Sequence, residues 1–235
     1  MVVMGITRAG GNMVESAYTA FRNARDLLLD AYGEYDRAVA TFEWPSFGET
    51  FNWAIDWFDA IARGNDGTAL WIVEENGSEA KYSFDDIARR SDQVARWLEQ
   101  QGIGRGDSVI LMLGNQVELW EAMLAVMKLG AVLMPTTTAI GSADLTDRVV
   151  RGNARAVIVN PSDTGKFDEV PGDYLRIATS ACDGWVDYAE ARGVEAVPFE
   201  SVTAPADRLL MYFTSGTTSK PKLVEHTQIS YPVGI

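Results

Sequence analysis

The chain has 235 residues, 47% of them hydrophobic, so it can bury a sizeable core as one large domain or two small ones. It carries 33 acidic and 20 basic residues, a net charge of -13, without a basic cluster, which argues against nucleic-acid or anionic-membrane binding. No apolar run approaches the ~20 residues of a membrane span, and the start lacks a signal-peptide pattern. We therefore expect a cytoplasmic protein with no membrane span.

The N-terminal part reads as an extension before the main domain. Residues 1–12 are expected to be unstructured, and apolar residues at helical spacing then predict a helix over residues 17–31. We assign residues 1–46 to this extension. A second helix is predicted over residues 51–62, where several aromatic residues crowd together. They could form a ligand cage, but packing in a core is the favoured interpretation.

The middle of the chain alternates between strand and helix patterns. An Asn76-Gly77 turn joins two short predicted strands, and Ser83 with Asp86 resembles a capping box at the start of a helix. The elements predicted after that helix are, in order, the strand 109–113, the helix 118–129, the strand 131–134, the helix 144–153, the strands 156–159 and 174–178, the short helix 185–191 and the strand 209–213. Apolar, β-branched strands alternating with helices predict an α/β fold in which helices flank a mostly parallel sheet.

Two single residues, Cys182 and Lys128, are candidate functional groups by residue type. Cys182 is the only cysteine, which excludes an internal disulfide and a cysteine-based metal cluster. With no local nucleophile signature, we interpret it as a small side chain that is at least half-buried. Lys128, at the end of a predicted helix, is interpreted as a surface charge that complements the helix dipole.

The most informative stretch is Thr214-Ser-Gly-Thr-Thr-Ser-Lys-Pro-Lys222, which follows a predicted buried strand. A strand that breaks into glycine and hydroxyl residues directs backbone N–H and side-chain O–H donors to one point, as a polyphosphate requires. Lys222 adds an ammonium group where the terminal phosphates would lie, and Pro221 stiffens the exit from the loop. An ordinary Ser/Thr-rich turn has a similar composition, and the Walker pattern is absent.

This stretch also resembles the phosphate-loop signature of the adenylate-forming superfamily, which includes acyl-CoA synthetases, luciferases and peptide-synthetase adenylation domains. The pattern Thr-Ser-Gly-Thr-Thr-Gly-x-Pro-Lys is matched except that Ser219 replaces the second glycine. If that position needs a positive φ, a serine costs about 1–2 kcal/mol there. Upstream, Phe51–Asp59 resembles the entry segment of acetyl- and medium-chain acyl-CoA synthetases, and Lys128–Pro135 matches a further family segment.

The resemblance implies an AMP-forming acid–thiol ligase that converts a carboxylic (fatty) acid to an acyl-adenylate and then to acyl-CoA. It implies ATP and Mg²⁺, with coenzyme A as co-substrate, but no metal ligand and no complete catalytic set is identifiable. The residues implied to contact the β- and γ-phosphates, with Lys222 as the charge partner, are Thr214, Ser215, Gly216, Thr217, Thr218, Ser219 and Lys222. His226 lies where many relatives carry histidine, and a helix-surface or packing role is favoured over a catalytic one.

Family members are roughly twice this length or more, so residues 47–235 are expected to be the first part of an AMP-binding (adenylation) domain, incomplete at the C-terminus. The isolated chain is then expected to be inactive, with the C-terminal half of the enzyme as its missing partner. Two alternatives stay open. The chain could be a shortened, non-catalytic relative that binds nucleotide phosphates or pairs with a separate half. It could also be an unrelated nucleotide or interaction protein.

Overall fold

The computed structural model describes residues 16–214 and 221–233. The contacts within the chain divide it into two units, Met1–Gly48 and Glu49–Ile235. Each unit is described by itself.

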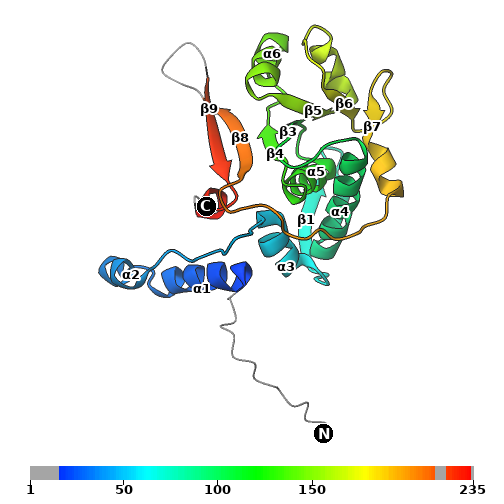
Figure 1. The fold of residues 1–235 in the computed structure, drawn as a ribbon. Coiled ribbons are helices and arrows are strands. Elements are labelled where there is room, and N and C mark those ends of the chain that lie inside the picture. The colour runs from blue at the N-terminus through cyan, green and yellow to red at the C-terminus, as the bar shows by residue number, and fades with distance from the viewer. Residues whose placement is uncertain (1–15, 215–220, 234–235) are drawn as a thin grey trace. The chain divides into compact units, whose positions relative to one another are not determined.

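In the described part of the first unit, residues 16–48, the helices α1 (Ala17–Asp30) and α2 (Tyr35–Thr41) are followed by an extended segment (Figure 1). The hydroxyl of Ser16 caps α1 by accepting the Thr19 N–H at 3.2 Å, so the helix begins where the apolar periodicity begins. Helix α2 was not predicted. It buries none of its residues, so its sequence has no apolar face from which a helix could be inferred.

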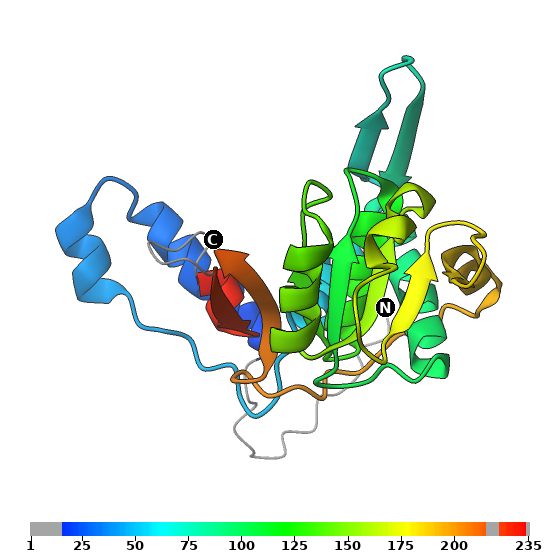
Figure 2. The same ribbon diagram turned by 90° about the horizontal axis from the view of Figure 1, so that it is seen from above.

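The second unit is built on a seven-stranded sheet in the order β7-β6-β5-β3-β4-β8-β9, visible in Figures 1 and 2. Neighbouring strands run parallel throughout, except that β8 and β9 pair antiparallel. The strands are β3 (Ser108–Met112), β4 (Val132–Pro135), β5 (Ala154–Val159), β6 (Leu175–Ala178), β7 (Val186–Asp187), β8 (Arg208–Thr214) and β9 (Lys222–Thr227). A separate antiparallel pair consists of β1 (Thr68–Val73) and β2 (Glu79–Ser83).

Helices cover both faces of the sheet, which confirms the predicted α/β fold. All five residues of β3 are buried: Val109 and Leu111 belong to one hydrophobic core, Ile110 and Met112 to the other. A strand covered on both sides reads as a continuous apolar run because neither face meets water. The first core includes residues of the helices α4 (Phe84–Gln100) and α5 (Val117–Lys128), and the second includes residues of α6 (Ser142–Arg151) and of the 3₁₀ helix η2 (Pro161–Phe167).

The start of α4 has the predicted cap. The Ser83 hydroxyl accepts the Asp86 N–H at 3.0 Å, and the Asp86 carboxylate accepts the Ser83 N–H at 3.1 Å. This reciprocal pair is a capping box. The carboxylate's acceptor bonds from Ser83 stabilise its ionised form and lower the pKa of Asp86.

Two predicted helices differ in the structure. In place of a regular helix over residues 51–62, a π-helix, η1 (Trp53–Asp59), continues into the short α3 (Ala60–Ala62). The predicted helix over residues 185–191 is wrong in its first half. There β7 pairs with β6, and a 3₁₀ helix, η3 (Tyr188–Gly193), follows. Sheet pairing by Val186 with Ile177 outweighs local helical spacing at this point.

Candidate functional site

The ends of the predicted phosphate loop face each other in the sheet. Thr214 is the last residue of β8, Lys222 is the first of β9, and the two are direct partners across the antiparallel pair. Directly opposed residues point to the same side of a sheet with Cβ atoms about 5 Å apart. The Thr214 hydroxyl and the exposed Lys222 ammonium therefore leave the hairpin on one side.

The other predicted contact residues lie outside the described residues: Ser215, Gly216, Thr217, Thr218 and Ser219. Their contacts with phosphate stay predictions. The position of the end of β8 is nevertheless informative. Strand β8 runs parallel to β4, so the chain leaves β8 at the carboxyl edge of the parallel strands, and ligands of open α/β sheets bind at that edge.

Two arginines on α6 contact this hairpin near the loop. Arg151 donates two hydrogen bonds to the carbonyl oxygen of Pro221, from Nη1 at 3.1 Å and from Nη2 at 3.0 Å. The guanidinium carbons of Arg148 and Arg151 lie 4.9 and 5.1 Å from the centre of the Phe213 ring. Sequence reasoning missed both residues. Their spacing of three on a predicted helix places them on one face, but nothing local indicates what that face contacts.

The histidine near the loop packs within the sheet. His226 lies on β9, and its ring stacks on Tyr212 of β8 with centroids 5.5 Å apart and an interplanar angle of 9°. The Tyr212 hydroxyl is 3.2 Å from Nε2, and the Ser230 hydroxyl is 3.4 Å from Nδ1. A helix-surface position is therefore excluded, while the favoured packing role agrees with these contacts.

Lys128 is not a surface charge, so the sequence interpretation was wrong. It is 1% exposed, and its ammonium lies 2.7 Å from Asp92 Oδ1 and 2.9 Å from Asp59 Oδ1. Arg63 closes the cluster at 2.6 Å from each of the two carboxylates. Burial raises the pKa of Asp59, and the neighbouring Lys128 and Arg63 oppose that rise. Two acids and two bases thus neutralise each other where α4, α5 and the entry segment meet.

A second buried carboxylate lies between α4 and α5. Glu121 accepts a hydrogen bond from Arg90 Nη1 at 3.0 Å and lies 3.4 Å from the Tyr188 hydroxyl. Burial raises the pKa of Glu121, and burial together with the nearby carboxylates raises that of Tyr188 well above its ordinary value. These residues line a polar hollow of about 470 Å³ with Arg89 and Arg192 at its sides. The residues that line this hollow include neither Thr214 nor Lys222.

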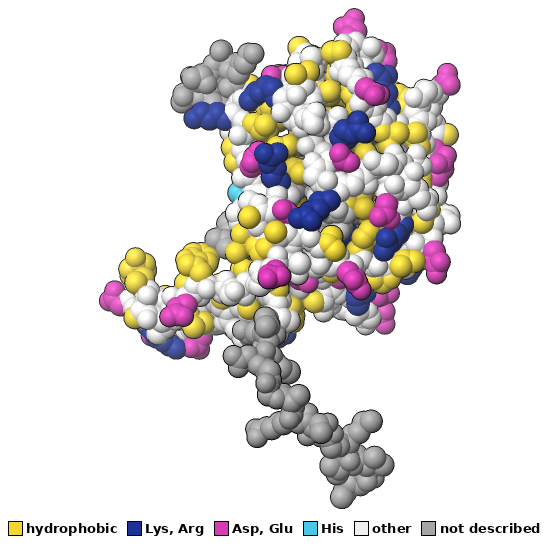
Figure 3. Space-filling view, viewed as in Figure 1, with side chains coloured by type: hydrophobic (Ala, Val, Ile, Leu, Met, Phe, Trp, Pro, Cys, Tyr) yellow, Lys and Arg dark blue, Asp and Glu magenta, His cyan; other side chains and the backbone are white. Residues whose placement is uncertain are grey.

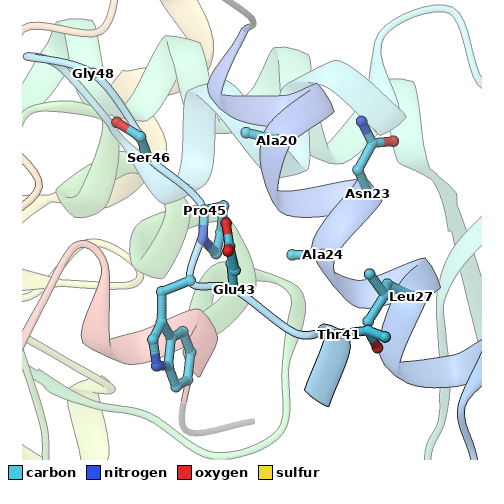
Figure 4. Close-up of a pocket in the computed structure, with 10 residues that line it drawn as sticks. Ala20, Asn23, Ala24, Leu27, Thr41, Glu43, Pro45, Ser46 and Gly48 are labelled. Carbon is cyan, nitrogen blue, oxygen red and sulfur yellow. The ribbon is translucent and has the colours of Figure 1, made fainter. Parts of the chain in front are cut away.

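Two other hollows lie among the described residues. The first, about 580 Å³, lies between α1 and the segment Thr41–Gly48 and is lined only by residues of the first unit (Figure 4). The second, about 280 Å³, has apolar walls that include Trp53, Phe58 and Trp120. Neither contains Thr214 or Lys222. Within residues 16–214 and 221–233, no group of three or more His, Cys, Asp or Glu side chains is placed to hold a metal ion.

The family follows from comparison with known proteins. A family model described as "AMP-binding enzyme" matches residues 57–232, which is most of the second unit. The chain belongs to the AMP-binding enzyme family. Its matching region includes the β8–β9 hairpin, both α6 arginines and the buried cluster around Lys128, so these features lie inside the AMP-binding domain match.

Relatives in this family are acyl-CoA ligases by name. Human mitochondrial acyl-coenzyme A synthetase ACSM5 is 31% identical over 217 residues, which cover 84% of this chain and 38% of that protein. The 4-hydroxybutyrate–CoA ligase 1 of Metallosphaera sedula is 34% identical over 191 residues, 78% of this chain and 33% of that protein. The chain therefore spans between 33% and 38% of the length of these two relatives.

Solved structures share the fold. The Brucella canis acyl-CoA synthetase superposes with a TM-score of 0.74 at 25% identity, covering 83% of this chain and 38% of that one. Acetoacetyl-CoA synthetase from Streptomyces lividans gives a TM-score of 0.68 at 22% identity, a likeness of fold alone. In the part of the chain that the structure describes, no helix is long and apolar enough to cross a membrane.

Surface charge on the second unit is mixed. In Figure 3, Lys and Arg side chains (dark blue) are interspersed with Asp and Glu (magenta) on the face shown. The face shown thus has no broad basic patch of the kind that nucleic acid requires.

Proposed function

We propose that the chain supplies the phosphate-binding part of an ATP-dependent carboxylic acid–CoA ligase. The observation that carries the proposal is the pairing of Thr214 with Lys222 at the mouth of a loop leaving the carboxyl edge of the sheet. In this proposal, Thr214 and residues 215–219 donate hydrogen bonds to the β- and γ-phosphates. Lys222 neutralises charge on the same groups. Residues 47–235 form the first part of the AMP-binding domain.

The chemistry proposed for the complete ligase has two steps. A carboxylate oxygen of the acid attacks the α-phosphorus of ATP, the bond to the bridging oxygen breaks, and pyrophosphate leaves. The thiol of coenzyme A then attacks the acyl carbon, loses its proton and displaces AMP. Mg²⁺ enters as the phosphate-bound cation of ATP, because Mg²⁺ in such sites is held largely by substrate phosphates. The protein's contribution on the phosphate side is positioning and charge neutralisation.

The residues present fit a polyphosphate. An exposed ammonium, a threonine hydroxyl and a glycine-containing loop match the donors that phosphate oxygens accept. The cytoplasmic location stays a prediction, because the name of the human relative places that protein in mitochondria.

The first test is ATP binding by the Lys222→Ala variant. We expect the dissociation constant for Mg-ATP, measured by calorimetry, to rise about tenfold or more, since a charge-assisted contact with phosphate is lost. Lys81→Ala is the matched control. Lys81 lies on β2 with its ammonium 4.1 Å from the centre of the Trp71 ring, so it removes the same charge elsewhere. Equal affinity in all three proteins would favour an unrelated nucleotide or interaction protein.

The second test is turnover by residues 1–235 alone. We expect no acyl-CoA formation, because the chain spans only 38% of the length of its human relative. The measurement is acyl-CoA formation over a panel of short- and medium-chain acids, with pyrophosphate exchange in parallel. Turnover would contradict the expectation. Weak ATP binding without exchange, in a protein that occurs naturally at this length, would favour the shortened, non-catalytic relative.

A further inference from the structure

The loop end of the β8–β9 hairpin lies at the edge of the sheet (Figures 1 and 2). β8 is in register with β4 at Leu210, paired with Leu133, while its pairing with β9 continues to Thr214. Phe213 and Thr214 are only half-buried. The position of this end therefore depends on contacts other than the β4–β8 ladder.

Arg151 supplies such a contact to one strand. Both terminal nitrogens of its guanidinium donate to the carbonyl oxygen of Pro221, the residue directly before β9. Asp147, one turn earlier on α6, holds Nη1 of the same guanidinium at 2.8 Å. The contact with Asp147 thereby fixes the orientation in which the planar guanidinium group faces the carbonyl oxygen of Pro221.

The other strand is contacted by the same pair of arginines. The Phe213 ring on β8 lies within 4.9 Å of the Arg148 guanidinium carbon and 5.1 Å of that of Arg151. These distances are within the range of a cation–π contact. Helix α6 thus touches both arms of the hairpin, next to Thr214 on one side and Lys222 on the other.

We propose that Arg151, with Arg148 beside it, is a positioning residue for Thr214 and Lys222, the two residues that flank the predicted phosphate loop. It fixes the spacing of the two residues from which the loop starts and ends, so that Thr214 and Lys222 present their donors to the same phosphate groups. The inference rests on the proposed function. It goes beyond the phosphate-loop motif, because both arginines belong to a helix more than sixty residues earlier in the chain.

The geometry distinguishes positioning from a general charge effect. A lysine at position 151 keeps the positive charge but offers no planar fork for a single carbonyl oxygen. If Arg151 acted only by attracting phosphate from nearby, lysine would replace it. If it acts through the Pro221 carbonyl, lysine at this position restores little of the ATP affinity that alanine loses.

The experiment compares Mg-ATP and AMP binding by calorimetry in residues 1–235 carrying Arg151→Ala, Arg151→Lys or the control Arg155→Ala. Arg155 lies on β5, with an exposed side chain 3.8 Å from Asp107. We expect Arg151→Ala and Arg151→Lys each to weaken ATP binding about tenfold. AMP lacks the β- and γ-phosphates, so its affinity for the Arg151 variants should stay at the wild-type level. The control variant should bind both nucleotides with the wild-type affinity.

Hydrogen exchange of the free proteins gives a readout that needs no nucleotide. Amides of residues 208–214 and 222–227 should exchange faster in Arg151→Ala, while β3 and β5 stay as protected as in the wild type. Unchanged exchange, or full rescue of ATP binding by Arg151→Lys, would overturn the proposal. If Lys222→Ala weakens ATP binding and Arg151→Ala does not, the positioning role fails while the proposed function stands. If the wild type does not bind Mg-ATP, the proposed function fails, and hydrogen exchange still tests whether Arg151 holds the two ends of the hairpin.

Discussion

Replacing Lys128 by methionine is expected to lower the free energy of unfolding by about 3–5 kcal/mol, because it leaves two buried carboxylates with a single cation, Arg63, between them. Lys128 contacts Asp59 and Asp92 at 2.9 and 2.7 Å and donates to the Ala88 carbonyl oxygen at 3.0 Å. Methionine has nearly the same length and fills the same space. The loss therefore measures the charge and its hydrogen bonds rather than a cavity.

The measurement is urea unfolding followed by tryptophan fluorescence at neutral pH. Glu99→Ala is the control on α4. Glu99 is 54% exposed and pairs with Arg96 at 3.1 Å, so its removal should cost less than about 1 kcal/mol. Equal losses in the two variants would contradict the importance of the buried cluster.

A double variant isolates the electrostatic part of the effect. Adding Asp92→Asn to Lys128→Met removes one buried negative charge and leaves Asp59 paired with Arg63 at 2.6 Å. We expect the double variant to be less destabilised than the sum of the two single variants, because each single change leaves the cluster with an unbalanced charge. Simple additivity would mean that charge balance does not determine the stability of this cluster.

Replacing Gly130 by alanine is the second change with a large expected effect, a loss of about 2–5 kcal/mol in the free energy of unfolding. Gly130 follows α5 with a φ of +68°, a conformation that costs an L-residue about 1–2 kcal/mol. An added Cβ would also lie 2.6 Å from Cγ2 of Thr203 and 3.3 Å from Cγ of Arg105. Overpacking of this kind costs typically about 1–3 kcal/mol more.

Thr203 cannot move aside easily. It is fully buried, its hydroxyl donates to the Phe51 carbonyl oxygen at 2.6 Å, and its own carbonyl oxygen accepts the Phe51 N–H at 2.8 Å. Shifting Thr203 would therefore also shift the entry segment that leads into η1. We therefore expect the clash to lower the free energy of unfolding in addition to the cost of the backbone conformation.

Gly102→Ala is the matched control for Gly130→Ala. Gly102 has a φ of +87° with no atom within 4 Å of an added Cβ, so only the backbone cost of about 1–2 kcal/mol is expected. Adding Thr203→Ser to Gly130→Ala removes the clashing methyl group and keeps the hydroxyl, which should restore part of the loss. Urea unfolding of the four proteins provides the measurement. Equal losses for the two glycine variants would show that the clash is relieved at little cost.

Patterns in the sequence predicted the fold class well because they reflect local burial. The run Val109–Leu113 is apolar on both strand faces, which only a strand covered on both sides requires, and β3 has that environment. The Ser83–Asp86 cap was also predictable, since both partners lie within one turn. In contrast, β9 and α2 went unpredicted, because neither has an apolar pattern of its own.

The candidate site was predictable only in part. The loop motif can be recognised from residue types at fixed spacing, so Thr214 and Lys222 could be named from the sequence. Arg151 could not, because its partner Pro221 lies far along the chain, and a helical arginine next to an aspartate reads as a surface ion pair. Lys128 was misread for the same reason: its partners lie on two other segments.

The sequence by itself determined the α/β class, the order of most strands and helices, the family resemblance and the position of the phosphate-loop motif. Each of these depends on neighbours within a turn or a strand. Only the tertiary structure decided that Lys128 is buried in an ion cluster, that Thr214 faces Lys222 and that Arg151 holds the carbonyl group before β9. The physical reason is that these contacts join residues far apart in the chain, and their energy depends on distance and burial, which no local pattern of residue types records.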